Sequence, residues 1–578
     1  MKSIRYIAVS LGAAALMLTS CNDFLDQEPD ERTHIDTEVK VEQLLIASYP
    51  TANYGWIGEI SSDNFMDNNA PHLPISSTAE QIPTRYNLGS YGRQDDELFR
   101  FEHCVSSDQQ DTPSYLWQSF YSSIFSTNEA LEAIDAIAAK SGMTDRLRRC
   151  RGEALLLRAY CHFILVNVFS QAYKDPEASK ADVGVPYVDK SSTDFTKKYD
   201  RENVAVTYQK IEADLEEGLK YVSDAGYDAP KYHFNVNAAH AFAARFYLFC
   251  RKYDKVIEHA NFVLDTNRSL LPQKLIDFSG MDNCTYMSDY VQIYESPDSP
   301  NNLFLLNTMS LMARHGLGYR YAHNSLCVRE VYYHQTPFNG LYAYPFIYVG
   351  GWTFWTGNDY GYFSAKAGEE FEYTDKLAGI GFPHTVRREF TNNMLLLERA
   401  EAEIMTGKYE DATLDLIAYN HSLQSFSEAN MQTFAGGYGM RDLRQSDIDG
   451  YFSNPDNYNC FADWDFTQRM SSSFIVPKEA VKYMNCLNEF RRIETCWDGT
   501  RFFDLKRFGI EYSHIYGPES EEIKLTWDDP RRAIEVPDDA IMAGLEPSRP
   551  TTKIEKGSEF VLRPFADFLR EEESYKNK

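Results

Sequence analysis

Residues 244–256 read ARFYLFCRKYDKV, and residues 400–412 read AEAEIMTGKYEDA. In each segment a small residue lies eight positions before the Lys of a Lys-Tyr-acid motif, and a small apolar residue follows the Tyr by three positions. Small residues allow two helices to pack closely, and an aromatic residue wedges against the next helix. The two segments therefore predict helix–turn–helix units of the same design. The alternative is two unrelated amphipathic hairpins.

Helical periodicity covers much of the chain around these two segments. Apolar residues recur at three- and four-residue spacing in residues 117–139, 146–169, 203–222, 237–264, 392–423 and 478–507. Helical hairpins that follow one another are typical of tetratricopeptide repeats. A regular array would repeat every ~34 residues, whereas the two legible copies begin at residues 244 and 400. Large insertions therefore interrupt the predicted array.

The insertions are rich in Gly, Pro, Asn, Asp and Ser, and they cover residues 50–115, 267–388 and 424–473. This composition predicts loops with short strands. Residues 315–363 contain fifteen Tyr, Phe or Trp residues among Gly and Asn, which suits sugar rings because their C–H faces stack on aromatic rings beside polar groups. The alternative is that these rings form a local core under the loops. The candidate ligand-binding residues are Tyr54, Trp56, Asp63, Asn64, Tyr321, Trp352, Trp355 and Tyr360.

The N-terminus reads as a targeting segment. Lys2 and Arg5 precede a twelve-residue apolar run, residues 7–18, which is too short to cross a membrane and suits a signal peptide. Residues 18–21 read LTSC and resemble the lipobox of bacterial lipoproteins, in which the signal is cut before a cysteine that is then lipidated. The sequence thus predicts a signal peptide at residues 1–20 and durable anchoring through lipid on Cys21. A soluble secreted protein is the alternative.

The composition excludes some classes of partner. The 578 residues carry a formal net charge of −28, so no basic stripe is present to bind nucleic acid. Nine cysteines remain besides Cys21, an odd number without a C-x-x-C motif, which disfavours a disulfide framework or a zinc site. Residues 154–169 are apolar but include Arg158, His162 and Asn167, and this favours a buried helix over a membrane span.

Several further motifs follow one another in a characteristic order. Trp117, Tyr121, Ile124 and Asn128 fit a W-x3-Y-x2-I-x3-N helix. Later motifs are RGEALLLRAY at residues 151–160, GVPY at 184–187, MLLLERAEA at 394–402, and EFRR, WDGTR and DLKRFG within 489–509. Together they resemble the SusD/RagB-like outer-membrane lipoproteins. Phe508 stands where that family usually has Trp, Asp498 where it has Glu, and Cys161-His162 where an aromatic residue is common.

This resemblance covers essentially the whole chain and implies a fold. We expect a mainly α protein in which tetratricopeptide-like helical hairpins form a superhelical scaffold, with large irregular loop insertions that carry short strands. After the signal peptide, residues 21–578 would form a single SusD-like domain, with an N-terminal part at about 21–235 and a C-terminal part at about 270–578. Charged motif residues such as Arg158, Arg501 and Asp504 are expected to be buried ion-pair partners rather than catalytic groups.

The resemblance also implies a function. Members of the family sit on the outer membrane, facing the cell exterior, and bind oligosaccharides or sometimes peptides without chemistry. They deliver these nutrients to a TonB-dependent transporter of the SusC kind. The acidic residues Asp23 and Asp26 just after Cys21 resemble the signal for surface display. The ligand-binding residues of the family vary, so none is transferred here by motif.

Other functions remain as alternatives. The sequence has no G-x-S-x-G, H-E-x-x-H or phosphate-loop motif, so an enzyme is not expected. A glycoside hydrolase needs only two carboxylates ~5–10 Å apart, which sequence does not test, and a peptide-binding or scaffold protein would share the fold. No metal or cofactor is predicted. Residues 447–450 lack the third acidic ligand of a calcium loop, and the sequence leaves a structural calcium ion elsewhere open.

Overall fold

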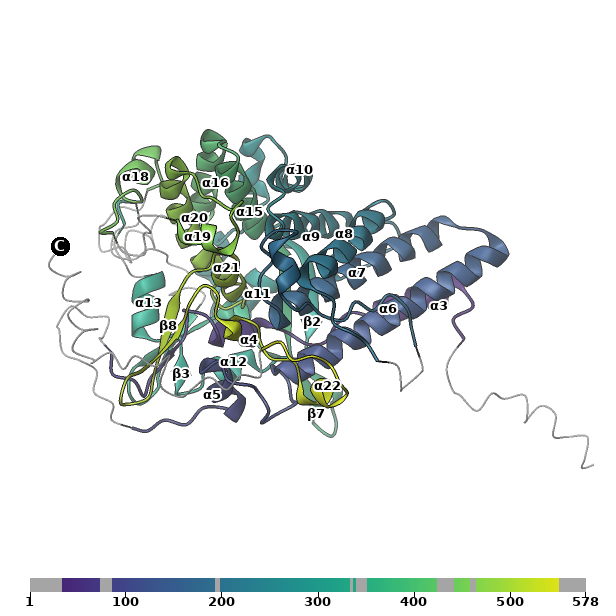
Figure 1. Ribbon diagram of the computed structural model, residues 1–578, viewed down its shortest axis with the longest axis horizontal. Helices are drawn as coiled ribbons and strands as arrows, with labels where there is room; N and C mark the ends of the chain where they lie inside the picture. Colours follow the sequence, from purple (N-terminus) through teal and green to yellow (C-terminus); the bar gives the residue numbers. More distant parts are fainter. Residues whose placement is uncertain are drawn as a thin grey trace, which may run out of the picture.

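The computed structural model describes residues 34–72, 86–192, 198–332, 336–338, 351–423, 441–457 and 464–549. Helices dominate these residues, and Figure 1 shows the helical hairpins side by side, from α6 and α7 at the right to α16 and α20 at the left. The helices of the scaffold are α6 (Pro113–Ser141), α7 (Asp145–Phe169), α8 (Val204–Leu219), α9 (Val236–Phe249), α10 (Tyr253–Leu264), α15 (Asn392–Met405), α16 (Tyr409–Ser422), α20 (Val481–Thr495) and α21 (Arg501–Phe508). The predicted mainly α fold with tetratricopeptide-like hairpins is confirmed.

Shorter helices lie mostly in the predicted insertions. They are α3 (Glu38–Ile46), α4 (Gly55–Ile60), α5 (Arg93–Phe99), α11 (Met287–Glu295), α12 (Met312–Gly316), α13 (Ser325–Val331), α18 (Gln445–Gly450), α19 (Phe466–Met470) and α22 (Asp538–Met542). The insertions therefore contain more helix than their composition predicts. Each of these helices is less than three turns long, so the pattern of apolar residues is too short to mark it.

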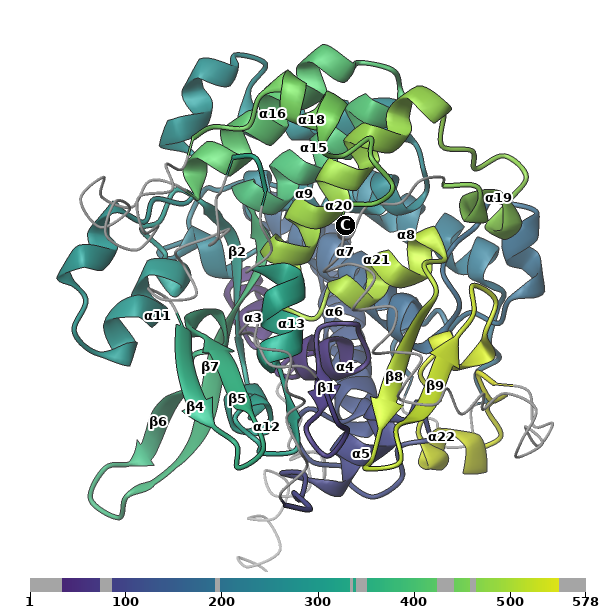
Figure 2. The ribbon, with the colours of Figure 1, turned by 90° about the vertical axis from the view of Figure 1, so that its left-hand side faces the viewer.

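The strands form small antiparallel sheets, and most of them lie in the predicted insertions. They are β1 (Met66–Asp67), β2 (Asn302–Thr308), β3 (Tyr321–Ala322), β4 (Gly351–Trp355), β5 (Tyr360–Ser364), β6 (Glu370–Asp375), β7 (Ile380–Thr391), β8 (Tyr512–Tyr516) and β9 (Glu521–Leu525). The sheets have the orders β1-β3, β2-β7-β6, β4-β5 and β8-β9. Figure 2 shows these sheets below the helices, with the β6–β7 hairpin projecting from the body. All six residues of β6 are exposed.

Helix α7 is the centre of the helical part, because nearly every residue from Gly152 to Phe169 is buried. An apolar surface on all sides requires neighbours on all sides, and α6 and α8 supply two of them. Arg158 on α7 donates to Asp214 on α8 at 2.6 Å and to Asn128 on α6 at 2.8 Å. The predicted structural role of Arg158 is thereby confirmed, since this one side chain ties three helices together.

The same helix is long and apolar enough to cross a membrane by composition. In the protein its most apolar window is entirely buried. Within the described residues no second helix passes this test. The prediction of a buried core helix at residues 154–169 is therefore confirmed.

The two repeat segments fold as hairpins with the same turn. Between α9 and α10, Lys252 N donates to Tyr247 O at 2.9 Å. Between α15 and α16, Lys408 N donates to Glu403 O at 2.8 Å. The residue before each Lys is left-handed, with φ of 59° at Arg251 and 76° at Gly407. Because both turns use one backbone geometry, the sequence repeat corresponds to a repeat of structure.

Candidate functional site

A surface pocket of about 560 Å³ opens among short elements that come from three distant parts of the chain. This volume falls within the range of small-molecule sites. Figure 2 shows the elements around it, β1 and the β8–β9 hairpin, close together on one face of the protein. The pocket is lined by Asn69, Tyr86, Asn87, Arg320, Tyr516, Gly517, Pro518, Glu519 and Glu521.

Arg320 holds the walls of the pocket together. Its Nε and Nη2 atoms donate to the two carboxylate oxygens of Asp67 at 3.1 and 3.0 Å, and Nη1 lies 3.1 Å from Asp96. Its guanidinium also lies over the Tyr516 ring, 4.7 Å from the centroid. The Asp67 carboxylate in turn accepts from the backbone N–H of Gly517 at 3.0 Å. The β8–β9 turn is thus bonded to β1, and the pocket is formed before any ligand arrives.

Tyr86 provides an exposed aromatic face at the pocket. The residue is 59% exposed, and its backbone is held from both sides by Asn358. The Asn358 side chain accepts from Tyr86 N–H at 2.9 Å and donates to Tyr86 O at 2.8 Å. The neighbouring Asn87 accepts from Asn69 at 3.3 Å, and its amide nitrogen has no protein partner among the described residues. The pocket therefore presents a ring face beside an available amide.

Two of the predicted ligand-binding residues come together next to this pocket. Trp355 on β4 and Tyr360 on β5 are register partners, with ring centroids 5.1 Å apart and planes at 70°. Each is 51% exposed. The turn between them carries Gly357 and Asn358, where a Cβ on Gly357 would lie 3.3 Å from the Tyr86 ring. Trp355 and Tyr360 thus form an exposed aromatic ledge whose turn packs against the pocket wall.

Other predicted residues are buried and bonded within the protein. The Tyr54 hydroxyl donates to Glu389 at 3.0 Å, and Trp56 Nε1 donates to Asp95 at 2.9 Å. The hydroxyl of Tyr321 donates to Asp96, and its ring is buried. These rings therefore lie in the core beneath the loops, which for Tyr321 was the alternative interpretation of the aromatic cluster.

Asp63 and Asn64 also make internal contacts. Asp63 accepts two hydrogen bonds of 2.8 Å from Arg501 on α21, and Asn64 accepts from Arg492 on α20 at 3.1 Å. Burial alone would raise the pKa of Asp63, but Arg492 and Arg501 outweigh it and lower the pKa below its ordinary value. Both acceptors thus join the first insertion to the C-terminal helices, and this corrects the interpretation of these side chains as ligand contacts. The side chain of Trp352 lies outside the described residues.

The pocket residues that sequence reasoning missed are Tyr86, Asn87, Arg320, Tyr516, Glu519 and Glu521. Residues 516–519 read YGPE, a turn signal between two short strands. That signal predicts a hairpin, but it does not indicate that the hairpin meets Asp67. The meeting depends on the Arg320–Asp67 contact between segments far apart in sequence.

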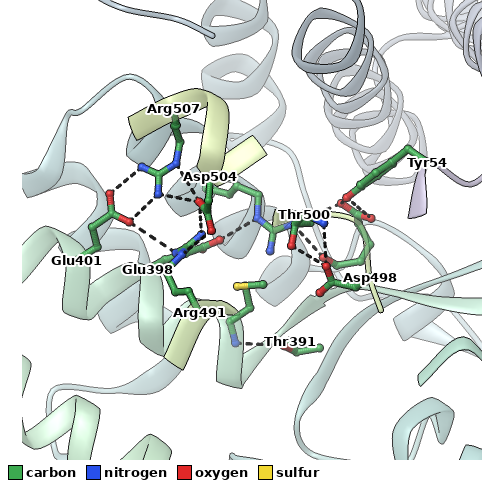
Figure 3. Close-up of polar contacts among 12 residues, drawn as sticks. Tyr54, Thr391, Glu398, Glu401, Arg491, Asp498, Thr500, Asp504 and Arg507 are labelled. Atoms are coloured by element: carbon green, nitrogen blue, oxygen red, sulfur yellow. Dashed lines mark hydrogen bonds and ion pairs between the residues drawn. The ribbon is translucent and has the colours of Figure 1, made fainter. Parts of the chain in front are cut away.

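A second cluster of polar residues is internal, and Figure 3 shows its contacts. Arg491 donates to both oxygens of Asp504 at 2.9 Å, and Arg507 donates to both oxygens of Glu401 at 2.7 Å. Arg245 donates to Glu398 at 2.8 Å beside them. The associated cavity measures about 10 Å³, room for roughly one water molecule. Each of these arginines pairs with a carboxylate, so the cluster holds helices together, as predicted for Asp504.

The described residues contain no group of three or more His, Cys, Asp or Glu side chains placed to hold a metal ion. The cysteines that the structure describes are free thiols. Cys21 and Cys460 fall outside the described residues.

Comparisons with known proteins agree with this architecture. Residues 23–248 match the SusD-like family model described as "Starch-binding associating with outer membrane". A SusD superfamily protein from Bacteroides vulgatus shares 18% identity and a TM-score of 0.56, over 89% of this chain and 99% of that one. For one from Bacteroides thetaiotaomicron the values are 17%, 0.53, 89% and 100%. For surface glycan-binding protein A from Bacteroides uniformis they are 14%, 0.51, 89% and 99%. No curated protein sequence matches the chain.

The fold and the pocket define a helical-repeat protein whose loop insertions carry a preformed surface site. Residues 23–248 are similar to the SusD-like family, and the solved structures of SusD superfamily proteins share the fold of the chain.

Proposed function

We propose that this protein is a lipoprotein of the outer membrane that captures oligosaccharides at the cell surface. It delivers them, without chemistry, to a TonB-dependent transporter of the SusC kind. The observation that carries the proposal is the preformed pocket in which the exposed Tyr86 ring lies beside the side chains of Asn87, Glu519 and Glu521. The names of related proteins, which include a surface glycan-binding protein, support a carbohydrate ligand.

The chemistry of the pocket suits a sugar. A pyranose ring has apolar C–H faces that pack on aromatic rings, and hydroxyl groups that bond to amides and carboxylates. Tyr86 offers the face, and Asn87 with Glu519 and Glu521 offers the polar partners. The ledge of Trp355 and Tyr360 would extend the surface beyond one sugar unit. An oligosaccharide therefore fits better than a single small sugar.

The distribution of carboxyl groups supports binding over hydrolysis. A glycosidase needs a general acid whose pKa is raised, placed at the bond to be cleaved. Burial raises the pKa of Glu59 to about 8, of Glu295 to about 9 and of Asp111 to about 6. These groups are buried in the core, and none of the described carboxyl groups with a raised pKa lines the pocket. Hydrolysis would give new reducing ends when the protein is incubated with glycans, and binding alone would not.

Replacing Tyr86 or Trp355 by alanine is expected to weaken oligosaccharide binding by about 1–3 kcal/mol each, because a stacking face is lost. Calorimetric titration of each variant with the glycans that bind the wild type measures this. Tyr286→Ala is the matched control, since Tyr286 is 71% exposed at the start of α11. Unchanged isotherms for Tyr86→Ala and Trp355→Ala, with folding intact, would remove both rings from the site.

A panel of glycans and peptides separates the proposal from a peptide-binding or scaffold function of the same fold. A ligand that binds only the folded protein raises its melting temperature. We expect increases with oligosaccharides and none with peptides. The reverse pattern would assign the site to peptides.

Replacing Cys21 by serine is expected to release the protein from the membrane, because the thiol that carries the lipid is absent. Fractionation of cells into soluble and membrane parts measures this, and Cys284→Ser is the control, since Cys284 is a free thiol within the folded part. A Cys21→Ser protein that still sediments with membranes would refute lipidation at this residue.

A further inference from the structure

We infer that the pocket selects its ligand by charge: it takes oligosaccharides that lack acidic groups, and it binds a sugar with a free, protonated amine more tightly than the N-acetylated form. This inference rests on the proposed function, because it concerns which oligosaccharides the same site accepts. It follows from which charged groups of the pocket are already paired and which are not.

The positively charged side chains at the pocket already have acidic partners. Three donor atoms of Arg320 contact Asp67 and Asp96, at 3.0 to 3.1 Å. Arg100 lies over the Tyr516 ring at 4.8 Å and pairs with Glu102 at 3.0 Å. An acidic sugar could reach either guanidinium only by competing with a carboxylate that is already in place. Neither arginine is therefore a ready anchor for a ligand carboxylate or sulfate.

The carboxyl groups at the pocket do not all have a basic partner. Glu519 is exposed and Glu521 is half-buried. Neither makes an ion pair with any residue that the structure describes, and Lys524 on the same hairpin pairs with Glu511 instead, at 3.2 Å. Arg320 carries one positive charge against the four carboxyl groups of Asp67, Asp96, Glu519 and Glu521, so negative charge predominates at the pocket.

This imbalance acts on a ligand in two ways. A carboxylate or sulfate on the sugar would be repelled by Glu519 and Glu521, and the net charge of −28 adds a repulsive field at long range. An ammonium group would gain an ion pair with either glutamate. Exposed ion pairs are weak, and two of them correspond to roughly a twofold to thirtyfold difference in affinity. Salt screens such contacts, so the difference shrinks at high ionic strength.

The test uses the full chain in a polyoxyethylene detergent, which carries no sugar headgroup. A glycan array presents neutral oligosaccharides, free-amine chitosan oligomers with their N-acetylated counterparts, and acidic galacturonate and sulfated oligomers. We expect neutral and amine-bearing glycans to bind and acidic ones not to bind. In solution, the free-amine oligomer should bind roughly twofold to thirtyfold more tightly than its N-acetylated form at ~20 mM NaCl, and about equally at ~500 mM.

The double variant Glu519→Gln/Glu521→Gln tests the cause. It should abolish the preference for the free amine and raise the signals of acidic glycans relative to those of neutral ones. Glu410→Gln/Glu479→Gln changes the net charge equally at exposed positions on the helical scaffold and should behave as the wild type. Acidic glycans that bind the wild type as tightly as neutral ones, or a preference that survives the double variant, would overturn charge selection alone. Binding of no glycan at all would overturn the proposed function with it.

Discussion

The Arg507→Met variant is expected to lose about 3–5 kcal/mol of its free energy of unfolding, because a buried carboxylate is left without its main partner. Arg507 on α21 donates to both oxygens of Glu401 on α15, each at 2.7 Å. Neither side chain is more than 5% exposed. Methionine fills similar space but donates no hydrogen bond, so Glu401 would keep only Arg491, at 3.6 Å. Denaturation with urea measures the loss.

A double variant and a surface variant give the controls. Combining Arg507→Met with Glu401→Leu should recover part of the loss, because no unpaired charge then remains in the core. Arg148→Met removes an exposed arginine that pairs with Asp145 at 2.7 Å, and it should cost less than about 1 kcal/mol. If Arg507→Met were as stable as Arg148→Met, the buried network would not hold the helices together.

The dependence of stability on pH gives a second measurement of the same network. Burial opposes ionisation of Asp504, but Arg491 and Arg507 outweigh it and lower its pKa to about 2, against an ordinary value of 3.8. Such a group adds stability that is complete above about pH 4 and is lost as the pH falls towards 2. Arg507→Met removes part of that contribution. The stability difference between variant and wild type should therefore narrow below pH 4.

Replacing Gly58 by alanine is expected to destabilise the protein by about 3 kcal/mol, because there is no room for a side chain there. A Cβ on Gly58, in α4, would collide with the backbone carbonyl of Gly499. Gly499 has φ of 84° and lies in the turn before α21. The carboxyl group of Glu59 accepts from the N–H of Asp498 at 3.1 Å in the same junction. Backbone cannot move aside as a flexible side chain can, so the two segments must separate.

Gly450→Ala is the matched control for this substitution. Gly450 ends helix α18, and a Cβ there would meet nothing within 4 Å. Its free energy of unfolding should stay within about 0.5 kcal/mol of the wild type. Equal stability of Gly58→Ala and Gly450→Ala would show that α4 and the Gly499 turn can move apart at little cost.

The helical scaffold was predictable because its pattern is local. The apolar spacing at residues 146–169 and 392–423 corresponds to helices within a few residues of the observed ends. The Lys-Tyr-acid repeat predicted hairpins that share one turn geometry. The W-D-G-T-R motif also has a physical basis, since Gly499 meets α4 and Arg501 pairs with Asp63. Motif residues of this kind report the packing of helices and do not mark a ligand site.

The pocket was only partly predictable because its walls meet through long-range contacts. Trp355 and Tyr360 flank a Gly-Asn turn, and in the structure both are exposed on one hairpin. Tyr54 and Trp56 have the same composition around them, yet both rings are buried. Sequence does not distinguish a ring that supports a loop from one that faces solvent. Whether a ring is exposed or buried depends on which segment packs above it.

The β8–β9 turn is bonded to β1 at the pocket, so ligand binding and the stability of the helical scaffold depend on different parts of the chain. The residues that face the pocket, from Tyr86 to Glu521, lie on turns and short strands, whereas the buried Arg507 network lies on the helices. Substitutions that retarget the pocket should therefore leave the scaffold intact. A protein of this kind is suited to engineering. Exchanging the three short segments that line the pocket is expected to change its ligand specificity and to leave the helices intact.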